Sequence, residues 1–509
     1  MMTCRYGYRP VRAGCAPPSI LFFVLLSIYV TLTSALEKSV EDPAARDPNL
    51  VTKEFDIGYG PESFDFYVPP DVSQCYGEEP GSRVAMKPKF KGMSGKFVNM
   101  SPHPVKWYWD PANGDPGVLM ANCPPFEAVG TATFPFHRFY FTDFNDPTKI
   151  LKRFTVMEGQ SVMYYDPFVV EGDERATRRN LESLTLDEYE KYEKRARTMR
   201  FNEIYRETTG RDYLPIYPRN KITHFLWPAD YYGQQHWATT KETHFVEIPP
   251  DEKAKKITVT GEERILAEDQ PRMLQEYRSK DDFLNMTLTV LSCAPRVFEI
   301  ENFMSDAEVD HVMNLANAIN LSKSTTTGGG DGNTDGSDST GTRTSFNSWI
   351  DREKSPVVDS IYRRAADLLL LDESLLRRRG KTELPDFRTK KSISESLQLV
   401  HYENNQQYTA HHDYGFGNIE DEEQEERYAT LLLYLNDRMT GGETCFPRWE
   451  NAETSDGLCA TPKKGKAVLF FSLLPDGNMD DLSQHAAEPV TEGEKWLINL
   501  WLHDPWFKQ

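Results

Sequence analysis

Residues 408–414 read Tyr-Thr-Ala-His-His-Asp-Tyr and lie between two segments, 395–402 and 428–435, that read as strands. In an extended backbone, residues two apart point to the same face, so His411 and Asp413 can contact one metal ion. Further strands are expected at 466–474 and 495–503. The sequence therefore predicts a strand-rich domain in the C-terminal part of the chain, with a metal site on it.

A second histidine and a lysine extend this pattern. His485 can provide another imidazole, and Lys495 follows it ten residues later. Two histidines and one carboxylate bind one face of an Fe(II) ion and leave positions for a bidentate 2-oxo acid and dioxygen. A His-Xaa-Asp triplet alone is most often a surface or structural feature. Its combination with His485 and Lys495 is much more specific.

The C-terminal segment as a whole resembles a known family. Residues 291–509 are similar to the catalytic domain of prolyl 4-hydroxylases, particularly the plant and algal kind. The motifs that carry the resemblance occur in family order: Pro295-Arg296-Val297-Phe298, Asn302-Phe303-Met304-Ser305, Arg343-Thr344-Ser345, Glu395 to Asp413, Arg427-Tyr428-Ala429-Thr430, Gly441-Gly442-Glu443-Thr444 and His485 to Trp496. The resemblance implies a mainly β domain with flanking helices, folded as a double-stranded β-helix (jelly roll).

The same resemblance implies roles for individual residues. The iron ligands would be His411, Asp413 and His485. Lys495 would pair with the distal carboxylate of 2-oxoglutarate, and Tyr402 and Thr444 stand where the family supplies hydroxyl donors to that cosubstrate. The positions that contact peptide map onto Tyr408, Arg427, Trp501 and His503. For Trp501, simple packing in the barrel is an equal alternative, and for His503 a polar structural role.

The activity implied is that of a procollagen-proline 4-dioxygenase-like enzyme. Peptidyl proline, O2 and 2-oxoglutarate would give hydroxyproline, succinate and CO2, with Fe(II) as the metal and ascorbate as the reductant used by the family. Two alternatives remain open at this point. The oxygenase could act on lysine or another substrate, because a fold does not determine a substrate. The chain could also be a lumenal binding glycoprotein whose oxygenase domain is inactive.

The remaining chain divides by composition. Residues 1–35 combine Arg5, Arg9 and Arg12 with an apolar run and small residues, which is typical of a signal peptide or, if uncleaved, a signal anchor. Residues 36–170 are rich in aromatic and β-branched segments and predict a separate β-rich domain, such as a β-sandwich, with a faint resemblance to the β-domain of von Hippel-Lindau-type proteins.

Two further regions complete this organisation. Residues 171–287 indicate a helical and aromatic-rich connector before the oxygenase domain at 288–509. Within that domain, residues 325–342 contain no apolar side chain and predict a disordered loop. Capping boxes at Thr185–Glu188 and Ser305–Glu308 predict the starts of two helices, and a third is expected after Pro356.

Charge and cysteine content bear on the partners and the compartment. The net charge of -20 disfavours nucleic acid, and it leaves membrane contact to an N-terminal anchor. A leader predicts entry into the secretory pathway, with residence in the endoplasmic reticulum lumen or, if the leader is retained, at the membrane of the endoplasmic reticulum or Golgi. Acceptor triplets for N-glycosylation begin at Asn99, Asn285 and Asn320. Cys445 and Cys459 flank a predicted hairpin or loop and could form a disulfide.

Overall fold

The structure, a computed structural model, describes residues 47–58, 60–68, 90–111, 113–215, 225–241, 244–245, 283–324, 342–379, 392–415, 426–450 and 457–504. Residues from Asp47 onward form one compact unit. The predicted leader at 1–35 and, apart from Thr342, the predicted loop at 325–342 lie outside the described residues. Within the described ranges, no helix has both the length and the apolar character needed to cross a membrane.

The N-terminal part of this unit is built from strands. A two-stranded sheet consists of β1 (Leu50–Asp56) and β2 (Pro61–Tyr67); a three-stranded sheet has the order β6 (Ala128–Thr133), β3 (Met93–Asn99), β9 (Val162–Tyr165); and a four-stranded sheet has the order β5 (Val118–Cys123), β4 (Val105–Asp110), β7 (Arg138–Asp143), β8 (Ile150–Thr155). The last two sheets share a buried aromatic core that includes Phe97, Trp107, Phe139 and Phe154. The expected β-rich character is confirmed here, whereas its separateness as a domain stays a prediction.

Two helices follow these strands, α2 (Glu174–Leu181) and α3 (Leu186–Thr209). The predicted capping box is present, since Thr185 accepts from the backbone N–H of Glu188 and the Glu188 carboxylate accepts from that of Thr185. The helix ends at Gly210, whose φ of 74° is the left-handed conformation that glycine adopts without strain. The predicted start of a helix at Thr185–Glu188 is therefore confirmed.

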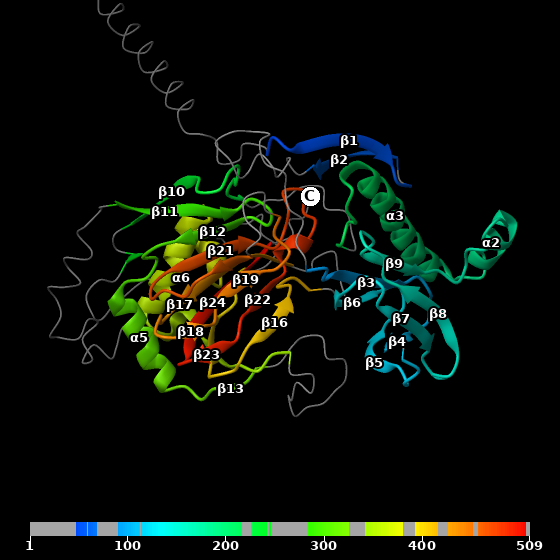
Figure 1. The fold of residues 1–509 in the computed structure, drawn as a ribbon. Helices are drawn as coiled ribbons and strands as arrows, with labels where there is room; N and C mark the ends of the chain where they lie inside the picture. The colour runs from blue at the N-terminus through cyan, green and yellow to red at the C-terminus, as the bar shows by residue number, and fades with distance from the viewer. Residues whose placement is uncertain are drawn as a thin grey trace, which may run out of the picture. The chain divides into compact units, whose positions relative to one another are not determined.

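The C-terminal part contains a large antiparallel sheet and a small one (Figure 1). In the described residues, the large sheet has nine strands in the order β10 (Gln235–Lys241), β11 (Phe283–Ser292), β12 (Val297–Ile300), β21 (Ala467–Phe471), β17 (Glu426–Tyr434), β24 (Lys495–Asp504), β15 (Leu397–Tyr402), β14 (Phe346–Ile350), β13 (Ser322–Lys323). The small sheet has the order β16 (Tyr408–His411), β22 (His485–Ala487), β19 (Thr444–Phe446), β20 (Leu458–Ala460), and β18 (Thr440–Gly441) pairs with β23 (Val490–Glu492). The four strands expected from the sequence are β15, β17, β21 and β24.

Helices flank the nine-stranded sheet, as the sequence predicted. They are α5 (Asp306–Asn317) and α6 (Pro356–Leu368), with the short 3-10 helices η3 (Arg352–Lys354), η4 (Glu373–Leu376) and η5 (Asp481–Ser483). In Figure 1, α6 lies behind the nine-stranded sheet and the small sheet lies in front of it. A buried ion pair between Arg364 and Glu308 joins α6 to α5 at 2.9 Å. The mainly β fold with flanking helices is thereby confirmed.

The large sheet also extends further toward the N-terminus than residue 288. Strand β10 at 235–241 pairs with β11, and β11 begins at Phe283. Part of the segment interpreted as a connector thus supplies an edge strand. The sequence of β10 contains no local sign of the strand with which it pairs. Cys445 and Cys459 lie opposite each other on β19 and β20 and form a disulfide, which confirms the pairing considered from the sequence.

Candidate active site

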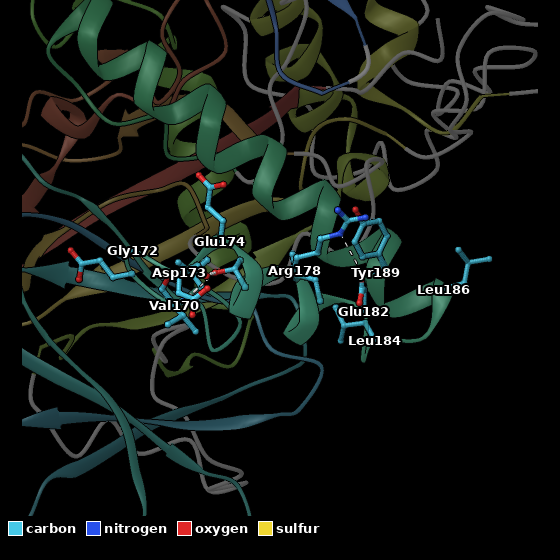
Figure 2. A pocket seen from close by; sticks show the side chains of 13 residues that line it. Val170, Gly172, Asp173, Glu174, Arg178, Glu182, Leu184, Leu186 and Tyr189 are labelled. Atoms are coloured by element: carbon cyan, nitrogen blue, oxygen red, sulfur yellow. Dashed lines mark hydrogen bonds and ion pairs between the residues drawn. The ribbon is translucent and has the colours of Figure 1, made fainter.

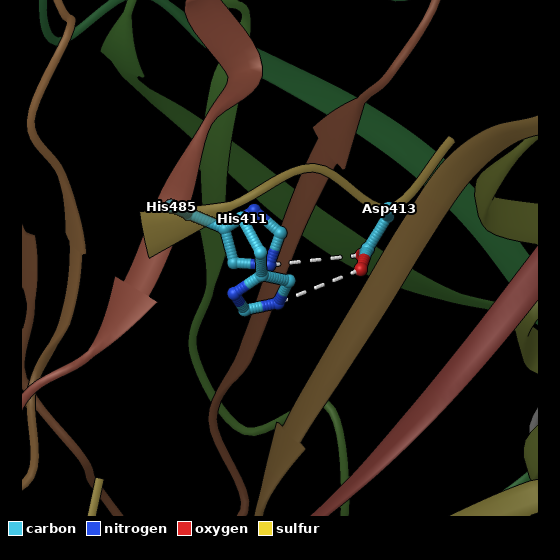
Figure 3. Close-up of side chains that lie close together, drawn as sticks. All are labelled: His411, Asp413 and His485. Atoms are coloured by element: carbon cyan, nitrogen blue, oxygen red, sulfur yellow. Dashed lines mark ion pairs between the residues drawn. The ribbon is translucent and has the colours of Figure 1, made fainter. Parts of the chain in front are cut away.

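Three side chains that the sequence assigned to metal binding meet between the two sheets. Candidate ligand atoms of His411, Asp413 and His485 all lie within 4.8 Å of one another. His411 ends β16, Asp413 follows it, and His485 begins the paired strand β22. Figure 3 shows both imidazoles turned toward the carboxylate, with Nε2 of His411 3.8 Å from Oδ1 and Nε2 of His485 3.7 Å from Oδ2. This is the donor set and spacing of a mononuclear metal centre.

The backbone fixes which nitrogen each histidine offers. Nδ1 of His411 is 2.8 Å from the carbonyl of Thr409, and Nδ1 of His485 is 3.1 Å from that of Ser483. An Nδ1–H that donates to a carbonyl leaves the Nε2 lone pair available to a metal. Burial lowers the pKa of both histidines, and for His411 the nearby His485 lowers it further. Both imidazoles are therefore neutral at pH 7, as metal ligands must be.

Asp413 is held in place by the nine-stranded sheet. Its Oδ2 accepts from the hydroxyl of Thr430 at 2.6 Å and from the indole N–H of Trp501 at 3.0 Å. Burial alone would raise the pKa of Asp413, but the adjacent His485 and His411 hold it below its usual range. The carboxylate is thus ionised and oriented. Sequence reasoning named Trp501 only as a peptide contact or packing residue, and it missed Thr430.

Lys495 supplies an unpaired buried cation next to this centre. Its side chain is 0% exposed, and its Nζ has no hydrogen-bond partner among the described residues. Burial lowers the pKa of Lys495 to about 7, against the opposing effect of Glu443 and Glu488. A buried ammonium without a partner destabilises the fold unless an anion pairs with it. A dicarboxylate cosubstrate therefore fits this position.

Two tyrosine rings lie beside the same lysine. The Nζ atom lies 5.3 Å from the ring centre of Tyr402 and 5.6 Å from that of Tyr434. Tyr434 donates a hydrogen bond of 2.8 Å to Thr444, so the structure links both predicted cosubstrate residues to Lys495. Tyr434 is an addition to the predicted set. Tyr434 lies 61 residues before Lys495 in the sequence, and only the pairing of β17 with β24 brings the two together, so no local signal marked it.

Three of the four residues mapped to peptide binding, Arg427, Trp501 and His503, form one cluster with Glu395. Glu395 receives two hydrogen bonds from Arg427, at 2.6 and 3.0 Å, and lies 2.9 Å from Nε2 of His503. The guanidinium of Arg427 lies 3.7 Å from the ring centre of Trp501. Tyr408 stacks on His411 with ring centres 3.5 Å apart. The structure thus places Tyr408 against His411, and Arg427, Trp501 and His503 around Glu395.

A hollow at the surface lies away from these residues. It has a volume of about 850 Å³ and is lined by residues of 169–189, including Val170, Leu181, Leu186 and Tyr189 (Figure 2). None of its lining residues belongs to the metal centre or to the clusters around it. The hollow and the candidate metal ligands therefore lie in different parts of the chain.

Comparison with known proteins agrees with this geometry. Residues 397–503 match the model of the 2OG-Fe(II) oxygenase superfamily. The chain is 35% identical to prolyl 4-hydroxylase 2 of Arabidopsis thaliana over 227 residues, which is 42% of this chain and 69% of that protein. It is 34% identical to probable prolyl 4-hydroxylase 7 of the same plant, of which it spans 65%, and to prolyl 4-hydroxylase subunit alpha-1 of Gallus gallus, of which it spans 36%.

Among solved structures, a viral collagen prolyl hydroxylase from Paramecium Bursaria Chlorella virus-1 is similar over 41% of this chain and 95% of its own, with 24% identity and a TM-score of 0.29. The metal-ligating triad, the buried lysine and the superfamily match define an Fe(II)- and 2-oxoglutarate-dependent dioxygenase. Within that class, the identity to the plant enzymes is decisive. The chain belongs to the prolyl 4-hydroxylase family.

Proposed function

We propose that this chain is an active prolyl 4-hydroxylase that converts peptidyl proline, O2 and 2-oxoglutarate into 4-hydroxyproline, succinate and CO2. The observation that carries this proposal is a complete set of site groups: three convergent candidate ligands and a buried lysine whose Nζ has no hydrogen-bond partner among the described residues. An oxygenase domain that had become a binding module would have no need to keep an unpaired buried ammonium, which destabilises the fold. We also propose that the nine-stranded sheet and the small four-stranded sheet together form a jelly-roll fold.

The proposed division of labour follows from the geometry. His411, Asp413 and His485 hold Fe(II), whose bound state supplies the coupled oxidation of 2-oxoglutarate and the prolyl ring. Thr430 and Trp501 keep Asp413 oriented through the two hydrogen bonds to Oδ2. These two residues are positioning residues, because they act through the carboxylate.

Lys495 is proposed to bind the distal carboxylate of 2-oxoglutarate, with Tyr402 and the Tyr434–Thr444 pair as neighbouring donors. Gly442 permits this arrangement, since a Cβ there would lie 3.2 Å from Cδ of Lys495. The apolar walls around the lysine exclude water, and a charge pair is stronger in such surroundings than in solution. Ascorbate is proposed as the reductant on family grounds.

The peptide is proposed to lie along Tyr408, Arg427, Trp501 and His503. The ring of Tyr408 offers a flat apolar surface for a pyrrolidine ring, and Glu395 holds Arg427 over the Trp501 ring and contacts His503. Proline rather than lysine is proposed as the substrate because the similar plant and chicken proteins are named as prolyl 4-hydroxylases.

Peptide turnover tests the proposed reaction. Succinate release should be stimulated by a proline-rich peptide and stay at background with a lysine-containing or a proline-free peptide of the same length. Mass spectrometry should locate one added oxygen on proline. Equal stimulation by the lysine peptide would favour the lysine alternative, and no stimulation by any peptide, with no succinate above a metal-free control, would favour the inactive binding protein.

The compartment is proposed from the leader, as the endoplasmic reticulum lumen or its membrane, and glycosylation offers a way to test it. Asn285 lies on the exposed face of β11, and Trp237 stands opposite Thr287 of the same acceptor triplet. Asn99, in contrast, is 0% exposed, and its Nδ2 donates to the carbonyls of His103 and Pro124. A glycan at Asn99 would displace both hydrogen bonds.

In protein secreted or retained by eukaryotic cells, we therefore expect a glycan on Asn285 and none on Asn99. Peptide mapping before and after enzymatic deglycosylation measures the occupancy of each site, and Asn285→Gln should remove the corresponding mass. Unmodified Asn285 in protein from such cells would contradict the proposed compartment.

A further inference from the structure

The two segments that carry the metal ligands are also tied to each other behind the metal centre. Residues 411–414 hold His411 and Asp413, and residues 472–484 lead from β21 into His485. The second segment is unusual for its buried polar side chains, which include Asp476, Asn478, Asp480 and Gln484. Buried polar groups need hydrogen-bond partners, because each unsatisfied group destabilises the fold.

Many of these partners come from the N-terminal part of the chain. Asp476 accepts from the backbone N–H of Tyr67 at 2.7 Å and from the hydroxyl of Tyr205 at 2.6 Å. The side chain of Asn478 accepts from the N–H of Leu214 at 2.9 Å and donates to the carbonyl of Asp212 at 3.0 Å. Strand β2, helix α3 and the segment after α3 thus hold the beginning of this ligand-bearing segment.

Ser94 of strand β3 reaches closer to the metal centre. Its hydroxyl donates to Oδ1 of Asp481 at 2.6 Å, and its backbone N–H donates to the same oxygen at 2.8 Å. The same hydroxyl lies 2.6 Å from that of Tyr414, the residue that follows the ligand Asp413. One buried serine therefore bonds both ligand-bearing segments at once.

Asp481 is the meeting point of this network. Besides Ser94, it pairs with Arg448, and Nε2 of His412 lies 3.2 Å from its Oδ1 and 3.1 Å from its carbonyl oxygen. His412 stands between the two ligands of its own segment, and Asp481 precedes His485 by four residues. A shift of Asp481 would consequently move both halves of the metal centre.

We propose that the N-terminal β-rich region is an integral part of the iron site, and that Ser94 is a positioning residue that keeps the two ligand-bearing segments in register. This inference rests on the proposed function, since it concerns the Fe(II) that the site would bind. Partners outside the ligand set orient the ligands and tune metal affinity. Here these partners are supplied by a part of the chain that lies more than 300 residues before the first ligand.

Anaerobic titration of the full-length protein with Fe(II), in the presence of 2-oxoglutarate, tests this role. The charge-transfer absorption of the iron–2-oxoglutarate complex reports binding without turnover. Ser94→Ala and Tyr414→Phe should each raise the apparent iron Kd by about 10-fold, the size typical of lost partners around a metal site. In the double variant, the iron Kd should rise by less than the product of the two single increases, because both changes remove the same hydrogen bond.

Thr133→Val is the matched control. It also removes a buried hydroxyl of the N-terminal region, but that hydroxyl bonds His137 within the same region at 3.1 Å. Its iron Kd should equal that of the unmodified protein, even if its thermal stability falls. If Ser94→Ala and Tyr414→Phe also left the iron Kd unchanged, or if their effects multiplied independently, the proposal would be overturned. A lack of charge-transfer absorption in the unmodified protein would instead contradict the proposed function.

Discussion

Asp413→Ala and His485→Ala are expected to lose peptide-dependent succinate formation almost completely. Each change removes one of three groups that converge on the metal position, and Asp413 is also the acceptor for Thr430 and Trp501. Loss of a residue that only supports a ligand already costs about 10- to 100-fold in affinity or activity. Removal of a ligand should therefore reduce turnover by more than about 100-fold. Succinate release at saturating 2-oxoglutarate and peptide, together with iron content after dialysis, measures both effects.

The control for these variants must be a histidine outside the metal centre. Strand alternation directs His412 away from the metal, and from the sequence alone a His412→Ala variant would be expected to keep most activity. In the structure, however, His412 hydrogen bonds to Asp481, so it is no neutral control. His311 on α5, which bonds Ser355 at 2.8 Å, is a better choice. Retained iron and turnover in Asp413→Ala or His485→Ala would show that other residues bind the metal.

The sequence predicted those features that depend on local or strand-periodic signals. The capping boxes at Thr185 and Ser305 mark the starts of α3 and α5, since a capping box needs only four consecutive residues. His411 and Asp413 could be paired because a spacing of two puts them on one face of an extended chain. His485 and Lys495 were assigned from their spacing, which matches that of the family. In the structure His485 lies beside His411 and Asp413, and Lys495 lies beside Tyr402.

What the sequence could not predict depends on strand register and on distant contacts. Trp501 donates to Asp413 across 88 residues, and the register between β17 and β24 shifts between Arg427 and Ala429. Such an irregularity changes which side chains face the site, and no alternation pattern reveals it. The bonds from Ser94 to Asp481 span 387 residues. The residue pattern of β3 predicted a strand but gave no indication of what that strand would contact.

The N-terminal region contributes to the stability of the catalytic part. It has a separate aromatic core around Phe97 and Trp107, and its residues Tyr67 and Tyr205 donate hydrogen bonds to the buried carboxylate of Asp476. Removing the region would take from Asp476 and Asp481 the hydrogen bonds that Tyr67, Tyr205 and Ser94 donate, each worth roughly 1.5–3 kcal/mol when the acceptor is charged. Residues 288–509 should accordingly be less stable alone than in the full chain.

Lys495 combines complete burial with a pKa lowered to about 7 by that burial. Its protonated form is the one that attracts a dicarboxylate, so binding of 2-oxoglutarate must raise the pKa of the ammonium. Below pH 7 the lysine is already protonated and binding takes up no proton. Above pH 7 binding must protonate it, and the 2-oxoglutarate Kd should rise by up to about tenfold per pH unit.

Lys495→Ala should raise the 2-oxoglutarate Kd by roughly 100- to 5,000-fold, because breaking a buried charge pair costs about 3–5 kcal/mol. It should also abolish the pH dependence, while iron affinity without cosubstrate changes little, since the three ligands remain. Lys495→Arg should recover only part of the affinity, because a planar guanidinium approaches a carboxylate differently. Lys466→Ala, which removes a buried lysine paired with Glu299 at 3.3 Å, is the control and should leave the 2-oxoglutarate Kd unchanged. Calorimetric titration with 2-oxoglutarate at pH 6.5 and pH 8.5 measures these differences, and an unaltered, still pH-dependent Kd in Lys495→Ala would place the cosubstrate elsewhere.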